Sequence, residues 1–324
     1  MSSNIHRVLV TGDAGFIGSH IVDQLLENGY VVGVLDNLAT GDLGNLTENR
    51  DNLVLHQGDI SNRDFVREAV KGYDAVIHEA ALVSVARSVE DPFVTNSTNV
   101  TGTLNVLKAA VDARVSRFVY ASSSSVYGET DVLPKREDLP ARPLSPYAVS
   151  KLAAENYCVA FARVYDLRTI CLRYFNVFGP RQRFGPYSGV IPIFIGRIGN
   201  GQPPKIYGDG EQTRDFTYVS DVVEANLLAM TADVKPVEVF NIAAGKTCTI
   251  NQLAGVIAQI MGREDLEPVH LSERRGDVKN SYADISKAVR WLGYVPRTTL
   301  HDGLKKVVAW FESNPIQTRS SATT

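Results

Sequence analysis

Short runs of apolar, often β-branched residues alternate with longer amphipathic stretches through the first two thirds of the chain. The strand-like runs are Arg7–Thr11, Val31–Leu35, Leu53–His56, Ala75–His78, Arg117–Ala121 and Thr169–Arg173. Helical periodicity covers Gly15–Asn28, Arg63–Val70, Val94–Ala113 and Pro146–Val164. Near-continuous apolar strands separated by helices are typical of a parallel sheet covered on both faces. The pattern therefore predicts an α/β fold with a doubly wound parallel sheet.

The pattern changes after Asn176, where residues 177–216 become rich in glycine and proline and predict loops. Further helices or strands are predicted at Ile191–Ile198, Val219–Thr231, Val239–Ile242, Thr249–Met261 and Leu300–Phe311. We expect a large domain of residues 1–176 plus about 217–247 and a smaller C-terminal α/β substrate-binding domain of about 177–216 plus 248–312. Residues 313–324 form a polar tail.

Bulk composition narrows the class of protein. The 324 residues are 44% hydrophobic and 21% charged, with a net charge of −3 and no stripe of lysine or arginine, which argues against a nucleic-acid or anionic-membrane surface. No apolar run approaches the roughly 20 residues of a membrane span, and the short polar start is no signal peptide. Three scattered cysteines (Cys158, Cys171 and Cys248) favour neither a disulfide framework nor a metal site. We expect a cytoplasmic protein without a bound metal.

The first strand ends in a glycine pattern, TGDAGFIG, that opens a helix. Gly12 permits a tight turn, Gly15 lets the backbone approach a diphosphate, and Gly18 lets the helix pack close to the strand. Free N–H groups at the helix N-terminus favour the phosphates. Asp36 ends the next strand, as expected for the residue that binds the ribose of a dinucleotide. The context predicts a Rossmann domain that binds NAD.

Asp36 also indicates which dinucleotide is bound. Its carboxylate would repel the 2′-phosphate of NADP, and no arginine follows it directly. NAD is therefore the expected cofactor. Asp59, after the third strand, either caps its loop or accepts a hydrogen bond from adenine.

Tyr147 and Lys151 stand four residues apart in SPYAVSK. The preceding proline suits a first helical turn, and the spacing places both side chains on one helix face. A nearby ammonium lowers the pKa of a phenol, because it stabilises the phenolate. The tyrosine is then a candidate general acid and base. The same spacing occurs by chance in many helices, but here it follows a dinucleotide-binding pattern.

Together, TGDAGFIG, SSSSVYG and YAVSK resemble the extended short-chain dehydrogenase/reductase family over nearly the whole chain. RYFNVFGPRQ, GDGEQTRDFTYVSD and RRGDVKNSYADISKA are similar to its sugar-nucleotide branch, and most similar to UDP-hexose and UDP-N-acetylhexosamine 4-epimerases. The resemblance implies an NAD-dependent isomerase that epimerises carbon 4 of a UDP-sugar through a 4-keto form, and it implies a homodimer formed by the helices near 94–113 and 146–164.

The resemblance also assigns roles to residues. Ser123 would join Tyr147 and Lys151 in catalysis, although Ser122 or Ser124 is an alternative. The cofactor would be contacted by Phe16, Ile17, Asn37, Asp59, Ile60, Ala80, Asn99 and Tyr174, besides the glycines, Asp36 and the catalytic pair. His78 would lie near the cofactor or would be an ordinary buried strand-end histidine. The substrate would be contacted by Asn176, Val190, Tyr207, Arg214, Arg274, Asp277 and Ser281, besides Ser123 and Tyr147.

Four other reactions of the family and one non-enzymatic role compete with this interpretation. A 4,6-dehydratase or a decarboxylase would carry an acidic residue before VYG, where this chain has Ser124 and Ser125. Deoxysugar-forming reductases would normally use NADPH. A UDP-glucuronate 4-epimerase is the main alternative, because SSSSVYG also resembles that group. A non-catalytic NAD-binding regulator would tend to lose the tyrosine and lysine.

Ser281 addresses the size of the sugar. In the resembling epimerases its position lies beside the 2-substituent, where a tyrosine restricts the enzyme to plain hexoses. The serine therefore predicts that UDP-GlcNAc and UDP-GalNAc are accepted as well as UDP-glucose and UDP-galactose. Alternatively, Ser281 caps a turn, and Tyr282 takes that place.

Overall fold

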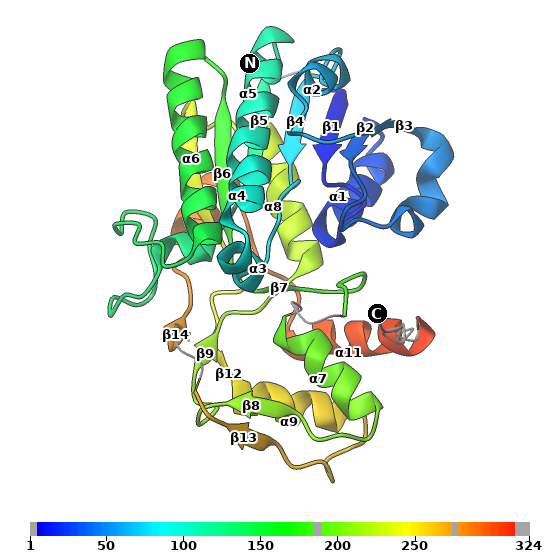
Figure 1. Ribbon diagram of the computed structural model, residues 1–324, viewed down its shortest axis with the longest axis vertical. Coiled ribbons are helices and arrows are strands. Elements are labelled where there is room, and N and C mark those ends of the chain that lie inside the picture. The colour runs from blue at the N-terminus through cyan, green and yellow to red at the C-terminus, as the bar shows by residue number, and fades with distance from the viewer. Residues whose placement is uncertain (1–4, 185–188, 274–277, 315–324) are drawn as a thin grey trace.

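The computed structural model describes residues 5–184, 189–273 and 278–314. In this part of the chain a large parallel sheet runs in the order β11-β6-β5-β4-β1-β2-β3 (Figure 1). Its strands are β1 (Arg7–Thr11), β2 (Val31–Asp36), β3 (Leu53–Gln57), β4 (Ala75–His78), β5 (Arg117–Ser123), β6 (Thr169–Tyr174) and β11 (Val237–Ile242). The strand order reverses between β1 and β4, which is where doubly wound sheets bind ligands.

Helices cover both faces of the sheet. On one face α1 (Phe16–Glu27) packs against α8 (Val219–Thr231), and on the other α2 (Arg63–Ala69), α5 (Thr103–Asp112) and α6 (Pro146–Tyr165) pack in sequence. Val8 and Val10 join the core under α1, whereas Leu9 joins the core under α2 and α5. This alternation follows from the two-residue repeat of a strand. The predicted doubly wound α/β fold is confirmed.

Two local predictions differ from the structure. The single helix expected at 94–113 is divided into α4 (Pro92–Asn96), a π-helical segment η2 (Ser97–Gly102) and α5, and it is preceded by α3 (Val85–Glu90). β3 was expected to be buried, but Val54 and Leu55 are 45% and 39% exposed. β3 is the last strand of the sheet, so one of its sides has no neighbouring strand to cover it.

The smaller part of the molecule lies below the large sheet in Figure 1. Its strands form three small sheets, β10 (Thr217–Tyr218) with β7 (Val177–Phe178), β12 (Cys248–Thr249) with β9 (Thr213–Arg214) and β14 (Asn280–Ser281), and β13 (Val269–Leu271) with β8 (Lys205–Tyr207). The helix α9 (Ile250–Ile260) packs between α7 (Val190–Gly199) and α11 (Leu300–Ser313).

One C-terminal helix returns to the large sheet. Although it belongs to the segment expected in the smaller domain, α10 (Ser286–Leu292) packs against β11 and α8. The exact domain boundaries stay a prediction. Among the described residues, no helix combines the length and apolar character needed to cross a membrane.

Candidate active site

The loop between β1 and α1 is shaped by close backbone contacts. Gly12 has a φ of +72°, and a Cβ there would lie 2.6 Å from the backbone nitrogen of Ala80. A Cβ at Gly18 would lie 2.3 Å from the Gly12 carbonyl oxygen. Because α1 begins at Phe16 without a side-chain cap from Gly15, its first N–H groups remain available to an anion. This loop fits the diphosphate of a dinucleotide.

The predicted ribose and adenine residues meet at the end of β2. Asp36 is buried, and it accepts hydrogen bonds from the N–H groups of Leu38 at 2.7 Å and Ala14 at 3.2 Å. Burial raises the pKa of Asp36, although these two bonds counteract the shift. Asn37 donates to Asp59 at 2.6 Å. A carboxylate has further lone pairs, so Asp36 retains the capacity to accept ribose hydroxyls.

Asp13 is a feature of the same loop that the sequence reading passed over. It is fully buried, and its two carboxyl oxygens have no hydrogen-bond partner among the described residues. Burial, followed by the charge of Asp36, raises its pKa to about 8. Asp13 therefore carries a proton over most of the neutral range.

Other predicted cofactor residues line the same edge. Phe16 and Ile17 are half-buried in the first turn of α1. Ile60 is buried and packs against Gly102. The Ala80 N–H donates to the Thr11 hydroxyl at 3.2 Å, which ties the end of β4 to the end of β1.

Asn99 lies in the π-helical segment η2. Its amide nitrogen donates to the Leu82 carbonyl and to the Ser150 hydroxyl, both at 3.0 Å, and its amide oxygen accepts from the Leu82 N–H at 2.8 Å. These bonds use both N–H donors of the amide. Asn99 therefore acts first as a clamp between the loop after β4 and α6.

His78 has the contacts of an ordinary buried histidine at the end of a strand, which is one of the two interpretations of the sequence. Its buried ring bonds to the hydroxyls of Thr11 at 2.6 Å and Thr103 at 2.9 Å. Burial, followed by the charge of Lys151, lowers its pKa to about 3. The ring is therefore neutral at physiological pH and serves as a buried strand-end histidine.

Tyr147 and Lys151 lie in the first turns of α6. Ser145 caps this helix by accepting from the Ala148 N–H at 3.2 Å. The Tyr147 N–H donates to the Ser88 hydroxyl at 3.0 Å, which anchors the helix start to α3. Both side chains are buried. The predicted pair is thus held on a rigid helix at the edge of the sheet.

The predicted electrostatic effect of the lysine is not found. Lys151 donates to the Ala121 carbonyl at 2.7 Å, and its nitrogen lies 5.2 Å from the Tyr120 ring centroid. Burial raises the pKa of Tyr147 to about 12, and a hydrogen bond with Ser123 only partly opposes that rise. Burial is the largest cause of this shift, and the ammonium is bound at the end of β5.

Two members of the four-serine run, Ser122 and Ser123, have different partners. Ser122 donates to Glu155 and is therefore committed to the core. Ser123 is half-buried, hydrogen-bonds to Tyr147 and accepts from the Ser125 N–H at 3.2 Å. This contact supports Ser123 as the partner of the tyrosine, a role that stays a prediction.

The predicted substrate residues come from several small elements. Arg214 and Ser281 are opposite each other in the register of β9 and β14, and Ser281 is buried. Asn176 has a φ of +33° and donates to the Asp215 carbonyl at 3.0 Å.

Tyr207 ends β8, and Val190 begins α7. Arg274 and Asp277 lie outside the described residues. The register of β9 and β14 is the firmest link between predicted substrate residues.

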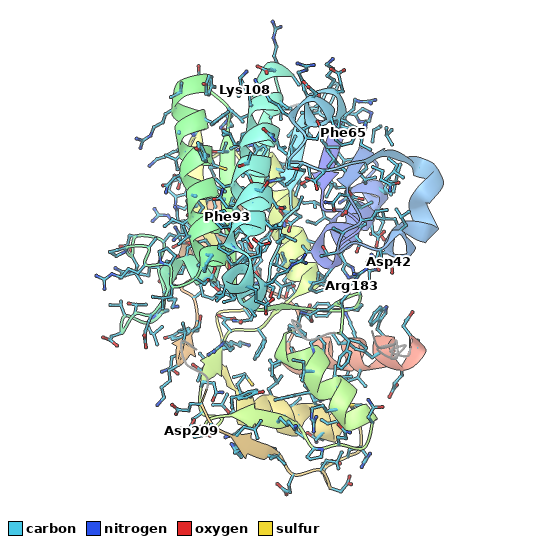
Figure 2. All side chains as sticks on the ribbon, viewed as in Figure 1. Asp42, Phe65, Phe93, Lys108, Arg183 and Asp209 are labelled. Atoms are coloured by element: carbon cyan, nitrogen blue, oxygen red, sulfur yellow. The ribbon has the colours of Figure 1, made fainter. Side chains whose placement is uncertain are left out.

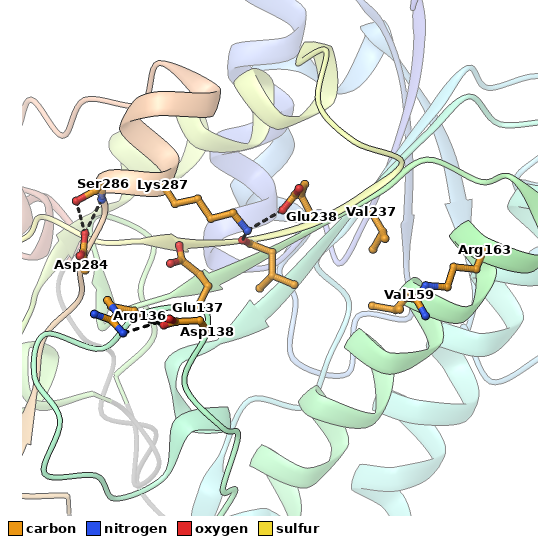
Figure 3. A pocket seen from close by; sticks show the side chains of 11 residues that line it. Arg136, Glu137, Asp138, Val159, Arg163, Val237, Glu238, Asp284, Ser286 and Lys287 are labelled. Carbon is orange, nitrogen blue, oxygen red and sulfur yellow. Dashed lines mark hydrogen bonds and ion pairs between the residues drawn. The ribbon is translucent and has the colours of Figure 1, made fainter.

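A surface groove of about 580 Å³ lies elsewhere, along the free edge of β11 (Figure 3). Lys287 forms an ion pair with Glu238 there at 2.7 Å, and its ammonium also donates to the Val239 carbonyl at 2.8 Å. Its lining residues, which are Arg136, Glu137, Asp138, Val159, Arg163, Val237, Glu238, Val239, Asp284, Ser286 and Lys287, include none of the predicted site residues. The side chains that line this groove cover the edge of the sheet at β11.

Glu79 is a site residue that sequence reasoning missed. The Tyr174 hydroxyl donates to its carboxylate at 2.6 Å, and Asn226 donates to that hydroxyl at 2.7 Å. Burial raises the pKa of Glu79 to about 7. The signal was present, because a carboxylate directly after an apolar strand marks the binding edge of a parallel sheet.

Comparisons with known proteins agree with this geometry. The model of the NAD dependent epimerase/dehydratase family matches residues 8–243. A UDP-glucose 4-epimerase from Mycolicibacterium smegmatis is 39% identical over 95% of this chain and 99% of its own. A UDP-glucuronate 4-epimerase from Thermodesulfobacterium geofontis is 37% identical over 94% of this chain and 96% of its own.

A solved structure gives the same picture. The UDP-N-acetylglucosamine 4-epimerase from Methanobrevibacter ruminantium M1, in complex with UDP-N-acetylmuramic acid, superposes with a TM-score of 0.91 at 41% identity. It covers 96% of this chain and 99% of its own. The expected family resemblance and the expected cofactor, NAD, are confirmed. The chain belongs to the NAD dependent epimerase/dehydratase family.

Proposed function

We propose that the protein is a UDP-hexose 4-epimerase that interconverts UDP-glucose and UDP-galactose and also UDP-GlcNAc and UDP-GalNAc. The observation that carries the proposal is the hydrogen bond between Ser123 and Tyr147 on the face of α6 that also bears Lys151. This arrangement supplies a proton acceptor for a sugar hydroxyl. At the neighbouring positions, Ser124 and Ser125, the chain offers no carboxylate for a dehydration or a decarboxylation.

Each side chain has one task in the proposed reaction. Bound NAD would supply the acceptor, and then the donor, of the hydride at carbon 4 of the sugar, so that hydride can return to the opposite face. The Tyr147 oxygen takes the proton of the 4-hydroxyl during oxidation and gives it back during reduction. Ser123 orients that hydroxyl toward Tyr147. Lys151, whose ammonium is held by the Ala121 carbonyl at the end of β5, would contact the bound cofactor.

The substrate range rests on the smaller part of the molecule. Arg214 would bind the diphosphate, since a guanidinium recognises phosphate oxygens in a bidentate manner. Its opposite position in the sheet is Ser281, so the register supports a place for Ser281 beside the sugar. A serine leaves room for an N-acetyl group. Asn176, Val190, Tyr207, Arg274 and Asp277 complete the proposed substrate site.

One observation favours UDP-glucuronate as a second candidate substrate. The buried Ser125 hydroxyl has no hydrogen-bond partner among the described residues. A buried hydroxyl without a partner is unfavourable, and a sugar carboxylate could supply the missing acceptor. The same catalytic pair would serve this substrate.

A direct assay tests these proposals. Purified protein is incubated with UDP-glucose, UDP-GlcNAc or UDP-glucuronate without added reductant, and products are identified by NMR and mass spectrometry. Epimers of unchanged mass are expected from the first two sugars, and Tyr147→Phe serves as the inactive control. Loss of water or carbon dioxide would identify another reaction of the family. No conversion of any UDP-sugar by the wild type would contradict the proposal and favour a regulatory role.

We further propose a homodimer built on α3, α4 and α6. These helices pack together and expose large apolar side chains, among them Phe93, which is 84% exposed (Figure 2). The others are Val85, Val89, Val94, Val149, Tyr157, Val164 and Tyr165. Contiguous apolar patches of this kind mark interfaces.

The three cysteines are free, which is compatible with the proposed cytoplasmic location.

The homodimer has its own test. Light scattering of the wild type is expected to give twice the chain mass, and Phe93→Glu with Val164→Glu is expected to give the monomer. Trp291→Glu, at an exposed aromatic residue on the separate helix α10, is the matched control and should remain dimeric. A wild-type monomer at micromolar concentration would disprove this part of the proposal.

A further inference from the structure

A chain of hydrogen bonds with a fixed direction crosses the carboxyl edge of the sheet. Asn226 on α8 donates to the oxygen of Tyr174, and it is itself held by the Val222 carbonyl at 2.9 Å. The Tyr174 hydroxyl must therefore direct its own proton to Glu79. This hydrogen bond favours the carboxylate form of Glu79 and so opposes the rise in its pKa that burial causes.

The backbone of Glu79 is equally constrained. Its N–H donates to the Thr11 carbonyl at 3.1 Å, and the following peptide lies against Gly12. The side chain can therefore not retreat without disturbing the cofactor loop. Its hydrogen bond to Tyr174 reaches from the end of β4 to the end of β6, across β5, whose Ala121 carbonyl accepts from Lys151.

The charge of Glu79 acts on both members of the catalytic pair. Lys151 is buried, which favours its neutral form, and the charges of Glu79 and Glu155 are what oppose this. Burial, and to a smaller extent the charge of Glu79, disfavour the phenolate form of Tyr147. A single carboxylate thus favours charge on the lysine and disfavours charge on the tyrosine.

Glu155 has the smaller part in this task. Both of its oxygens bind Arg173, at 2.9 and 2.8 Å, and it also accepts from Ser122. Its charge is therefore already balanced by a buried guanidinium. The other titratable groups around Glu79 are Tyr174 and the neutral ring of His78.

We propose that Glu79 is a positioning residue of the epimerisation, whose carboxylate keeps the Lys151 ammonium charged and restrains the Tyr147 oxygen from losing its proton. The inference rests on the proposed function, in which Tyr147 moves a proton to and from the sugar. Glu79 thereby sets the pH range in which lysine and tyrosine are together in their working states. It touches neither the sugar nor the reacting proton.

Proton NMR detection of ¹³C-labelled lysine side chains tests the proposal without any substrate. The ε-carbon resonance of Lys151 is assigned by its absence from Lys151→Arg and is titrated with pH in the NAD-free protein. Removal of a nearby opposite charge in Glu79→Gln should lower the midpoint by about one pH unit. Glu79→Asp, which keeps the charge, should restore most of the wild-type midpoint.

The pH profile of turnover provides the second measurement. In Glu79→Gln, both the acid limb and the alkaline limb should move to lower pH, because Tyr147 and Lys151 each lose their proton more readily. A lower turnover with both limbs and the Lys151 midpoint unchanged would reduce Glu79 to a structural residue.

If Glu79→Gln does not fold, Tyr174→Phe takes its place. It removes the hydrogen bond that favours the Glu79 carboxylate, so a smaller shift of Lys151 in the same direction is expected. No shift would overturn the proposal. Because the titration needs no UDP-sugar, failure of this inference is distinguishable from failure of the proposed reaction.

Discussion

The two parts of the site are built in different ways. On the cofactor side, long strands bring loops into contact by backbone approach, as where Gly12 meets Ala80. On the proposed substrate side, Arg214 and Ser281 are opposite each other in strands of only two residues. Few hydrogen bonds hold such a pair, so local opening is easier there. The cofactor side is therefore prebuilt, whereas the proposed substrate side is adjustable, as expected if one chemistry serves several sugars.

The largest effect is expected at Tyr147, which lies between the two parts. Tyr147→Phe removes the acid/base oxygen but nearly preserves packing, so turnover should fall by about 10²- to 10⁴-fold. NAD and the UDP-sugar should bind as before, as measured by calorimetry. Turnover close to that of the wild type would show that another group moves the proton.

Substitutions at Gly12 and Gly29 test the close backbone approach on the cofactor side. Gly12→Ala places a Cβ 2.6 Å from a backbone nitrogen, whereas Gly29 has a similar φ of +78° and no atom within 4 Å. Gly29→Ala should therefore lower the free energy of unfolding by only about 1 to 2 kcal/mol, the strain of the left-handed backbone. Gly12→Ala should be more destabilised and should lose NAD binding, as followed by urea denaturation and calorimetry. Equal destabilisation by the two variants would mean that the close approach is unimportant.

Asp13 gives the same side a pH dependence. Its pKa is about 8 when folded and 3.8 in a model peptide, so between these values the native state holds a proton that the unfolded chain has lost. Its contribution to the free energy of unfolding therefore falls as pH rises from about 4 to 8. Asp13→Asn should stabilise the protein by about 4 kcal/mol more at pH 8 than at pH 4.5, because each pH unit between the two pKa values corresponds to about 1.4 kcal/mol. Denaturation of the NAD-free protein at both pH values measures this, and equal differences would contradict it.

The smallest effect is expected on the adjustable side. Ser281→Tyr fills the space that we assign to the 2-substituent, at a cost of about 1 to 3 kcal/mol for the N-acetyl sugars. Turnover of UDP-GlcNAc should fall about 5- to 100-fold relative to UDP-glucose. Ser281→Thr, a smaller change, is the matched control. Equal effects of the tyrosine on both sugar pairs, or no N-acetyl activity in the wild type, would refute the gate.

The large sheet could be predicted from the sequence because its strands are long enough to show apolar runs. The two-residue strands β9 and β14 carry no periodic signal, so Arg214 and Ser281 were assigned only through family resemblance. The spacing of Tyr147 and Lys151 placed them correctly on one helix. It could not reveal that Lys151 binds the Ala121 carbonyl, since that contact depends on the position of β5.

Asp13 and Glu79 were missed for a common reason. Each lies beside residues that attracted attention through a motif, Asp13 between glycines and Glu79 between His78 and Ala80. Their importance comes from burial and from neighbours distant in sequence, such as Tyr174. A motif shows which residue types recur together, whereas a shifted pKa depends on what surrounds a side chain in three dimensions.

The π-helical segment η2 has a consequence for changes in chain length. A wider turn in a helix accommodates one more residue than a regular α-helix of the same rise. Deleting one residue from Ser97–Gly102 would let α4 and α5 merge into a regular helix, yet it would rotate Asn99 by about 100° away from Leu82 and Ser150. One deletion would thus make the helix regular and would also remove the hydrogen bonds of Asn99. In alignments of this family, single-residue gaps are therefore expected in this segment. Inserting or deleting one residue here changes the direction in which the Asn99 side chain points.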